Sequence, residues 1–333
     1  MKFRSGSPRK LLFPILLLAT SLDCLSQTVL QELAHVGGFN GTQTLGVTVS
    51  GDYVFLANQY SGLRVYDISN PYLPKFVSAR NDGGLAWSVT IAERFAYVAN
   101  GEGGLRIYDV KQPRHLKQVA HVPQTQPFAE ARAVAVSGDY AYVANCVDGL
   151  RVYDVSNPRS PRNVGFAPTG DWMEGIAVAG NYVYLANETD GLRVYDVSDA
   201  GHPVLANIID EGLPFDLAVS NNHLYVADHY TGIWVYDLSD PRNPVAVAHI
   251  DPTVGASKVA VAGNSACFVT GSGIAIYDIS TPAQPFKTGA VGGLYANDVA
   301  IGGPLLFTAE AFDGFSVYLF LPILHSGSLS NPR

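Results

Sequence analysis

One ten-residue phrase recurs along this 333-residue chain and constrains its fold more than any other feature. At its first appearance it reads GLRVYDISNP, and later copies keep most of it, the last one in a shortened form. Neighbouring copies start 41 to 45 residues apart, at Gly62, Gly104, Gly149, Gly191, Gly232, Gly273 and Gly314. Self-similarity at this period is typical of a propeller or a solenoid. The chain is therefore predicted to consist of seven similar units.

Each unit reads as four short strands, here called a, b, c and d. In the third unit the predicted strands are residues 132–136, 140–144, 150–155 and 163–167. Turn residues separate them: Ser137-Gly138-Asp139 suits a tight hairpin, and prolines break strand c from strand d. Four strands in a unit of this length favour a propeller blade, because a β-solenoid coil is much shorter.

The last unit has strands a, b and c but no convincing strand d. Residues 30–36, LQELAHV, match the d strands of other units, notably LKQVAHV at 116–122. A displaced strand of this type would complete the last blade and remove an open sheet edge. The predicted fold is therefore all-β: a seven-bladed β-propeller with four antiparallel strands per blade, closed by the N-terminal strand.

Composition agrees with this fold and excludes others. The apolar set makes up 47% of the residues and charged residues only 15%, which argues against disorder. The 33 glycines and 20 prolines are too many for a coiled coil or helical bundle.

The chain opens with basic residues followed by a short apolar run, residues 11–19. This pattern is typical of a signal peptide, and an uncleaved anchor is the alternative. The predicted organisation is a signal peptide at 1–26, a propeller at 27–320 and a tail at 321–333, with an extracytoplasmic, secreted or cell-surface location. No membrane span is expected after cleavage, and the excess of acidic residues disfavours nucleic-acid binding.

The phrase GLRVYDVSNP at Gly149, preceded by Tyr-Val-Ala-Asn at 142–145, resembles the LVIVD repeat of bacterial and archaeal secreted or surface proteins. Arg and Tyr replace two apolar positions of that consensus. The resemblance covers nearly the whole mature chain. It implies a β-propeller and an extracytoplasmic setting, and it implies no defined chemistry and no catalytic residues.

Residues that recur in every unit are predicted to be structural. The aspartate that ends each strand c precedes a turn and suits an Asx-type side-chain bond, as at Asp67 and Asp154. An arginine recurs in strand c of the first four units, at Arg64, Arg106, Arg151 and Arg193. We expect it to pair with carboxylates of a neighbouring blade, with a groove-lining role as the alternative. Cys146 and Cys267 are expected to be a loop thiol and a core residue.

The b–c and d–a loops lie on one face of such a ring, the top face, and they vary more than the c–d and a–b loops of the bottom face. Acidic residues on the top face far outnumber its bases, Arg80 and Arg132, and aromatic residues accompany them. Variable loops on a uniform scaffold commonly bind ligands. The candidate ligand-binding residues are Asp82, Trp87, Glu130, Asp171, Trp172, Glu174, Glu188, Asp190, Asp216, Asp228, Tyr230, Asp298 and Glu310.

The predicted function is a non-catalytic binding scaffold that engages a protein or polysaccharide, including a cationic one, through this acidic face. The alternative is a hydrolase or lyase that uses paired carboxylates in the central channel. A structural envelope module and a merely solubilising acidic surface are further readings. No cofactor is predicted, and Ca²⁺ at top-face carboxylates such as Asp171, Glu174, Glu188 and Asp190 is the one metal to consider.

Overall fold

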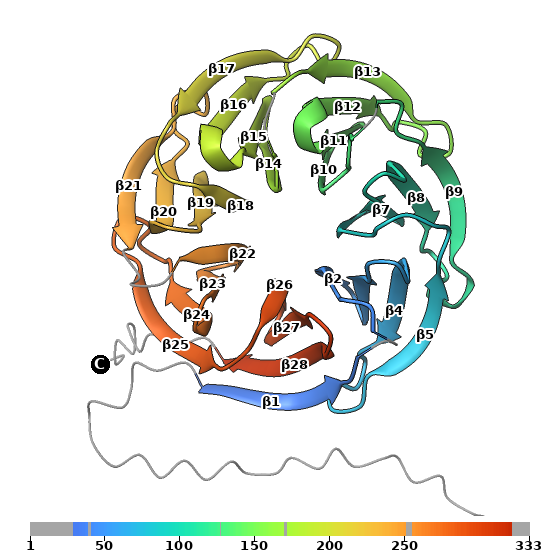
Figure 1. Ribbon diagram of the computed structural model, residues 1–333. Coiled ribbons are helices and arrows are strands. Elements are labelled where there is room, and N and C mark those ends of the chain that lie inside the picture. Colours follow the sequence, from blue (N-terminus) through green and yellow to red (C-terminus); the bar gives the residue numbers. More distant parts are fainter. Residues whose placement is uncertain (1–28, 39–40, 127, 170–171, 251–254, 322–333) are drawn as a thin grey trace, which may run out of the picture.

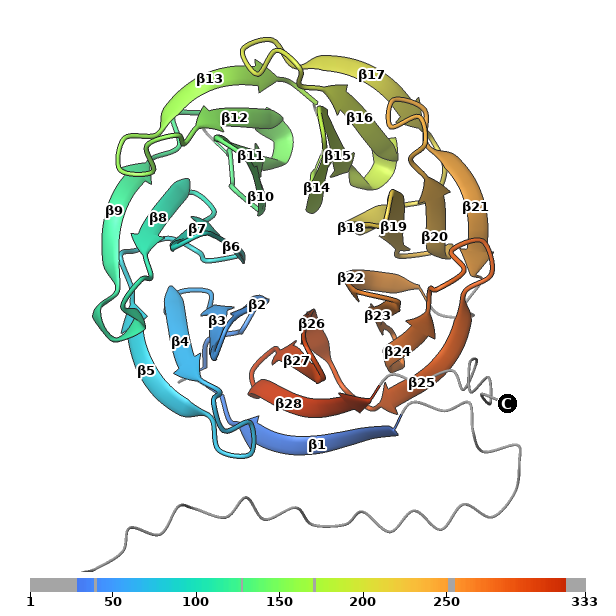
Figure 2. The same ribbon diagram turned by 180° about the vertical axis from the view of Figure 1, so that it is seen from behind.

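The computed structural model describes residues 29–38, 41–126, 128–169, 172–250 and 255–321. Seven antiparallel four-stranded sheets stand around a central axis, and both views along that axis show the ring (Figures 1 and 2). The all-β seven-bladed propeller predicted from the repeat is confirmed. The predicted signal peptide and all but the first residue of the predicted tail lie outside the described residues.

Each blade has two inner strands. Strand a lines the central axis, and strand b pairs with it on its outer side. The a strands are β2 (Gly46–Ser50), β6 (Ser88–Ala92), β10 (Ala133–Ser137), β14 (Gly175–Ala179), β18 (Pro214–Ser220), β22 (Ala256–Ala262) and β26 (Ala296–Gly302). The b strands are β3 (Tyr53–Ala57), β7 (Phe95–Ala99), β11 (Tyr140–Ala144), β15 (Tyr182–Ala186), β19 (His223–Asp228), β23 (Ser265–Thr270) and β27 (Leu305–Glu310).

The outer half of each blade holds the recurring phrase and the rim. The c strands are β4 (Leu63–Asp67), β8 (Leu105–Asp109), β12 (Leu150–Asp154), β16 (Leu192–Asp196), β20 (Gly232–Asp237), β24 (Gly273–Asp278) and β28 (Gly314–Leu321). The d strands are β5 (Lys75–Arg80), β9 (Lys117–Val122), β13 (Arg162–Ala167), β17 (Val204–Ile209), β21 (Val245–Ile250), β25 (Phe286–Gly292) and β1 (Val29–Val36). Short 3-10 helices are η2 (Pro113–His115), η3 (Cys146–Asp148) and η4 (Glu188–Asp190).

The seventh sheet joins the two ends of the ring. Its order is β1-β28-β27-β26, so the N-terminal strand is its outermost member. The strand β1 runs antiparallel to β28, with Leu30 opposite Phe320 and Val36 opposite Phe315. The pairing shifts register between Glu32 and Ala34.

The core lies between adjacent blades rather than within one sheet. One cluster, for example, joins Phe55 and Val65 of the first blade to Val98 and Tyr108 of the second. The b strands are therefore covered on both faces, which is why they read as almost unbroken apolar runs such as FAYVA in β7. The d strands have one face on the rim and alternate between half-buried and exposed side chains.

Two constraints require glycine before strand c: the backbone conformation and the lack of space for a side chain. Gly149 has a φ of 121°, and a Cβ there would lie 2.2 Å from the carbonyl oxygen of Ala167. Both conditions exclude larger residues, because L side chains rarely adopt this conformation and the backbone contact leaves no space.

The recurring aspartates form the predicted turns. In all six intact copies of the phrase, the carboxylate accepts a hydrogen bond from the backbone N–H two residues later, as Asp154 does from Ser156 at 3.0 Å. Hydrogen bonds from Ser156 and Arg162 lower the pKa of Asp154 to about 2. These residues are structural, as the repetition predicted.

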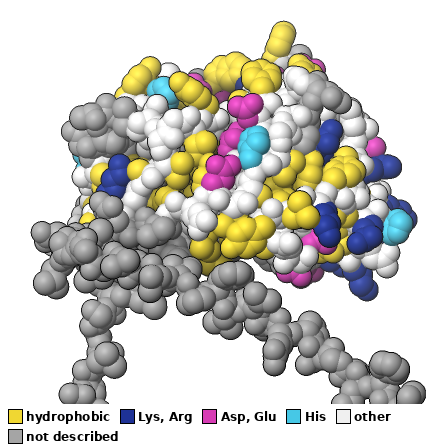
Figure 3. Space-filling view, turned by 90° about the horizontal axis from the view of Figure 1, so that it is seen from below, with side chains coloured by type: hydrophobic (Ala, Val, Ile, Leu, Met, Phe, Trp, Pro, Cys, Tyr) yellow, Lys and Arg dark blue, Asp and Glu magenta, His cyan; other side chains and the backbone are white. Residues whose placement is uncertain are grey.

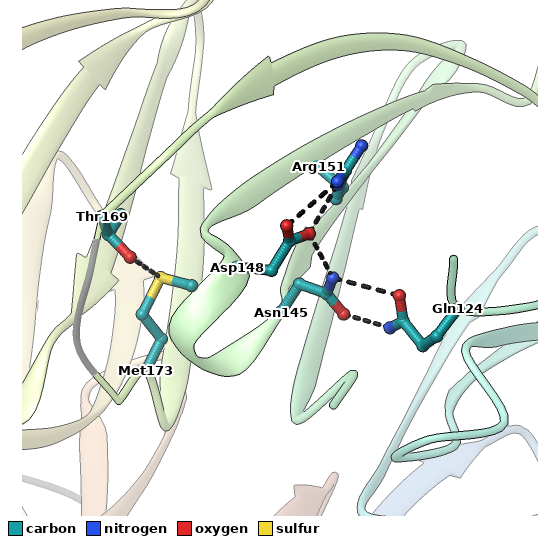
Figure 4. Close-up of polar contacts among 6 residues, drawn as sticks. All are labelled: Gln124, Asn145, Asp148, Arg151, Thr169 and Met173. Carbon is teal, nitrogen blue, oxygen red and sulfur yellow. Dashed lines mark hydrogen bonds and ion pairs between the residues drawn. The ribbon is translucent and has the colours of Figure 1, made fainter. Parts of the chain in front are cut away.

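For two of the recurring arginines, Arg151 and Arg193, the predicted partner from a neighbouring blade was wrong. Arg151 donates to Asp148 of its own blade, from Nε at 2.7 Å and from NH2 at 3.0 Å (Figure 4). Arg193 pairs in the same way with Asp190. The 3-10 turns η3 and η4 place each aspartate three residues before its arginine, so the partner comes from the same b–c loop.

The two cysteines lie where the sequence suggested. Cys146 belongs to η3 in a b–c loop and Cys267 to the core strand β23, and both are buried. In the described part of the chain, no helix has the length and hydropathy needed to cross a bilayer.

Candidate functional site

A cavity of about 330 Å³ occupies the top-face end of the central channel. Its walls are the first residues of the a strands, and all seven blades contribute to them. The a strands are the innermost in the ring, as Figures 1 and 2 show, and their N-terminal ends follow the d–a loops of the top face. We call this site the channel mouth.

Strand register places one residue of each blade at the same level of the channel mouth. Asp216, Lys258 and Asp298 pair with Ala227, Val269 and Ala309, which are equivalent positions of their b strands. In the other four blades the equivalent residues are small: Gly46, Ser88, Ala133 and Gly175. The charged side chains of this level are therefore confined to blades five, six and seven.

The two aspartates of this level also join neighbouring blades. The Oδ2 atom of Asp216 accepts a hydrogen bond from the backbone N–H of Val259 at 3.0 Å. The Oδ2 atom of Asp298 likewise accepts one from Val47 at 2.8 Å. Each carboxylate thus holds the a strand of the next blade as well as facing the cavity.

Burial changes the acidity of these groups. Loss of solvent raises the pKa of Asp298 to about 7, against the opposing effect of Lys258. Burial also raises the pKa of Asp216. Burial alone would lower the pKa of Lys258, but the carboxylates of Asp216, Asp298 and Glu174 outweigh it and raise the pKa. Lys258 is therefore a cation between two carboxyl groups, one of which titrates near neutral pH.

Lys258 is not among the residues predicted from sequence. Because its positive charge was left out, the net negative charge expected at the centre of the top face was too large. Asp216 and Asp298 were predicted only as candidates on the top-face loops, whereas the register places them with Lys258 at one level of strand a. The sequence does contain this pattern. The residue before the first apolar residue of the register, Val47 and its equivalents, is small in four units and charged in three.

A second charged group links blades two, three and four. The guanidinium of Arg132 pairs with Glu130 at 3.1 Å and with Glu174 at 3.3 Å. It also lies over the ring of Trp87 at 3.9 Å and that of Trp172 at 5.2 Å, measured from Cζ to the ring centroids. The structure therefore brings four predicted residues together around an arginine that the sequence presented only as a counter-charge.

Trp87 Nε1 and Ser88 Oγ are buried atoms of residues that line the channel mouth, and neither bonds to any described residue. Nearby, Asn297 Nδ2 donates to the carbonyl oxygen of Thr44 at 2.9 Å. Because both buried atoms are closed off from solvent, their lack of a partner costs free energy, and they are not presented to the cavity.

The remaining predicted residues are held elsewhere. Asp82 pairs with Arg80 at 3.4 Å and accepts a hydrogen bond from Tyr108 at 3.1 Å. Asp190 pairs with Arg193, and Glu188 is its neighbour in η4. Among these described residues, Asp82, Glu188 and Asp190 do not line the channel mouth. Asp171 lies outside the described residues.

Two predicted acids are loop anchors. Asp228 is 1% exposed and accepts hydrogen bonds from the backbone N–H groups of Tyr230 and Thr231, at 2.9 and 2.6 Å. Glu310 is 7% exposed, accepts a hydrogen bond from Thr308 and lies 3.5 Å from His35 Nδ1. Both occupy the end of a b strand, where other blades place a buried asparagine such as Asn145. Asn145 instead donates from Nδ2 to Gln124 Oε1 at 3.1 Å and to Asp148 Oδ2 at 2.7 Å (Figure 4).

Exposed aromatic side chains surround the channel mouth on the top-face loops. They are Tyr60, Phe128, Trp172, Tyr230, Tyr295 and Phe312. Tyr295 also lines a second cavity of about 430 Å³ between blades six and seven. In the side view of Figure 3, hydrophobic side chains project along the upper rim, whereas Lys and Arg gather towards the lower right.

No group of three or more His, Cys, Asp or Glu residues in the described part of the chain has an arrangement that suits a metal ion. Among the carboxylates considered for Ca²⁺, Glu174 and Asp190 are paired with arginines. The site therefore consists of hydrogen-bonding side chains, charges compensated within the protein, and two tryptophans.

Solved structures share this fold at low sequence identity. A catalytically inactive virginiamycin B lyase from Staphylococcus aureus, solved with quinupristin, has a TM-score of 0.69 at 13% identity, over 89% of this chain and 100% of that chain. The β-propeller domain of Cps50 (Swd1) from Myceliophteria thermophila has a TM-score of 0.69 at 13% identity, over 87% and 99%. The computationally designed Ika8 protein has a TM-score of 0.61 at 11% identity, over 87% and 100%. These likenesses concern the fold alone.

No curated protein matches the sequence. The model of the LVIVD repeat matches six segments, residues 41–82, 83–122, 129–168, 173–211, 212–251 and 255–291. These segments contain the first six blades of the ring and span most of the chain. The protein therefore belongs to the LVIVD repeat family.

Proposed function

We propose that this protein is a secreted or cell-surface binding scaffold, without catalysis, that engages a protein or polysaccharide ligand through the top face. The observation that carries the proposal is the channel mouth, an open cavity to which every blade contributes. Concave sites with a few convergent polar groups are the usual places where proteins bind ligands. The exposed aromatic side chains around it enlarge the contact surface, since aromatic residues are enriched where proteins bind partners.

The state of the carboxylates favours binding over catalysis. Glu174 is paired with Arg132, and Asp216 and Asp298 each accept a backbone hydrogen bond from the next blade. Acid–base catalysis on a glycan needs two carboxyl groups that exchange protons with substrate and water. Here the same groups hold blades together, so their movement would disturb the ring.

A hydrolase or lyase is the second candidate, and one observation favours it. The pKa of Asp298 is raised by burial to about 7, which suits a general acid at neutral pH. Incubation of the protein with each glycan that it binds, followed by chromatography of the products, separates the two candidates. A binding scaffold returns the glycan unchanged, whereas an enzyme produces shorter or unsaturated fragments.

The test of the binding function uses two probes, a glycan array and a library of displayed peptides. The substitutions Trp172→Ala and Glu174→Gln alter the top face, and Arg114→Ala is a matched control in η2, on the bottom face. We expect the top-face pair to weaken binding by about tenfold and the control to leave it unchanged. Binding that is lost only in the control variant would place the ligand on the other face. Fractionation of cells that produce the full chain tests the location, and protein retained in the cytoplasm would contradict secretion.

A further inference from the structure

The channel mouth restricts the chemistry of its ligand through the charges already present. Its cations, Arg132 and Lys258, face the carboxyl groups of Glu174, Asp216 and Asp298 in the same cavity. An anionic ligand would approach three carboxyl groups, and a cationic ligand would approach a lysine and an arginine. Because opposite charges are already close to one another, a net charge on the ligand gains little. An apolar ligand would remove water from these charges without replacing its hydrogen bonds.

The hydrogen-bonding capacity that remains includes both donors and acceptors. Lys258 lines the cavity, and its ammonium group carries three N–H donors. The oxygens of Asp298 accept one backbone hydrogen bond each, from Val299 to Oδ1 and from Val47 to Oδ2. A carboxylate oxygen has room for about two. The occupant must therefore accept hydrogen bonds from one part of the wall and donate them to another.

Hydroxyl groups meet this condition, since each one donates and accepts. A ring with several neighbouring hydroxyls satisfies the lysine donors together with the carboxylate acceptors. The exposed indole of Trp172 at the edge of the site offers an aromatic surface for the apolar C–H face of such a ring. The cavity of about 330 Å³ is at the small end of ligand pockets, which suits one such ring better than an extended chain.

From these features, and resting on the proposed binding function, we infer that the channel mouth binds one neutral sugar unit of a glycan. Lys258 donates to its hydroxyl oxygens, and Asp216 and Asp298 accept from its hydroxyl groups. The rest of a longer glycan extends over the exposed aromatic side chains of the top face. Lys258 is then a ligand-binding residue rather than only a structural counter-charge.

The test is calorimetric titration of the full chain with neutral oligosaccharides of glucose, galactose, mannose and N-acetylglucosamine, chosen by array. Galacturonate and glucosamine oligosaccharides and free amino acids are the charged comparisons. We expect a neutral glycan to bind and Lys258→Met to weaken it by about tenfold or more. Asp298→Asn removes one carboxylate acceptor of the cavity wall and should weaken binding by about twofold to tenfold. Lys287→Met changes an exposed lysine of the same blade and should have no effect.

Two results would overturn the inference. One is a preference for charged glycans or amino acids, and the other is equal affinity of the wild type and both channel variants. If Lys258→Met unfolds, Asp298→Asn alone decides, because it keeps the size of the side chain. Binding that depends on Trp172 but not on Asp298 or Lys258 would leave the top-face function standing and remove the sugar subsite. If no neutral glycan binds, the inference fails, and the peptide library decides whether the face binds a protein.

Discussion

At the channel mouth, one position of each inner strand determines what the ring presents to a ligand. Four blades carry a small residue there, and the other three carry Asp216, Lys258 and Asp298. Small residues leave space for a cavity, whereas the charged residues supply hydrogen-bonding groups on one side of it. The asymmetry of the site thus comes from three side chains on an otherwise repetitive scaffold.

The buried carboxyl group of Asp298 should make stability depend on pH. Its pKa is about 7 in the folded protein and has an ordinary value of 3.8. Between these values the folded state binds more protons at this site than the unfolded chain does. The contribution to stability is therefore fully present below pH 3.8 and is lost as the pH rises through 7.

Asp298→Asn removes this titration and keeps one acceptor oxygen. We expect the midpoint of thermal unfolding to fall less steeply in the variant than in the wild type as the pH rises from about 4 to 7. Differential scanning fluorimetry over this range measures the difference, with Asp216 unchanged in both proteins as an internal reference. Parallel curves for the two proteins would show that Asp298 titrates normally.

Among the elements, β1 differs from the other outer strands because it comes from the opposite end of the chain. It contributes Leu30, Ala34 and Val36 to the clusters that pack blade seven. Its pairing also covers the edge of β28, which would otherwise expose unpaired backbone groups.

A chain that begins at residue 38 lacks β1 and should be less stable than a chain that begins at residue 29. Three partly buried apolar side chains and one strand pairing are lost, so we expect the unfolding midpoint to fall by about 10 °C or more. The shortened chain should also self-associate through the exposed edge of β28. Scanning calorimetry and sedimentation velocity measure the two effects. Equal midpoints and a monomeric shortened chain would mean that β1 is dispensable.

Most of the strands were predictable from sequence because the same strand pattern recurs in each of the seven units. The predicted strand 140–144 is β11, and the predicted strand 132–136 is displaced from β10 by one residue. The site was less predictable, because the sequence does not show where a loop ends and a channel-lining strand begins. That single uncertainty hid Lys258 while leaving Asp216 and Asp298 among the candidates.

Asp228 and Glu310 show the same limit of prediction from sequence. Each lies at the end of a b strand, directly before a loop, and only the packing of adjacent blades shows that it is buried. Pairing of Asp190 with Arg193 depends on a 3-10 turn that composition does not reveal. Sequence pattern thus identifies the face, whereas tertiary packing selects which of its residues remain available.

At the scale of the whole molecule, the ring is a repetitive support for one irregular opening. The bottom-face aspartates form the same turn in blade after blade, and some also pair with arginines, as Asp109 does with Arg159 at 3.0 Å. The top face departs from this uniformity through its loops and through the charged residues of blades five to seven. The central claim is that ligand enters at this opening.

Intrinsic fluorescence tests this claim most directly, because the three tryptophans lie in different places. Trp87 lines the channel mouth, Trp172 lies at its edge, and Trp234 stacks on His249 at 3.8 Å in blade five. A glycan that binds in the channel mouth should change the emission of the wild type and of Trp234→Phe, and should have little effect on a variant that carries both Trp87→Phe and Trp172→Phe. A full emission change in that double variant, or bound glycan without any change in the wild type, would contradict a ligand site at the channel mouth.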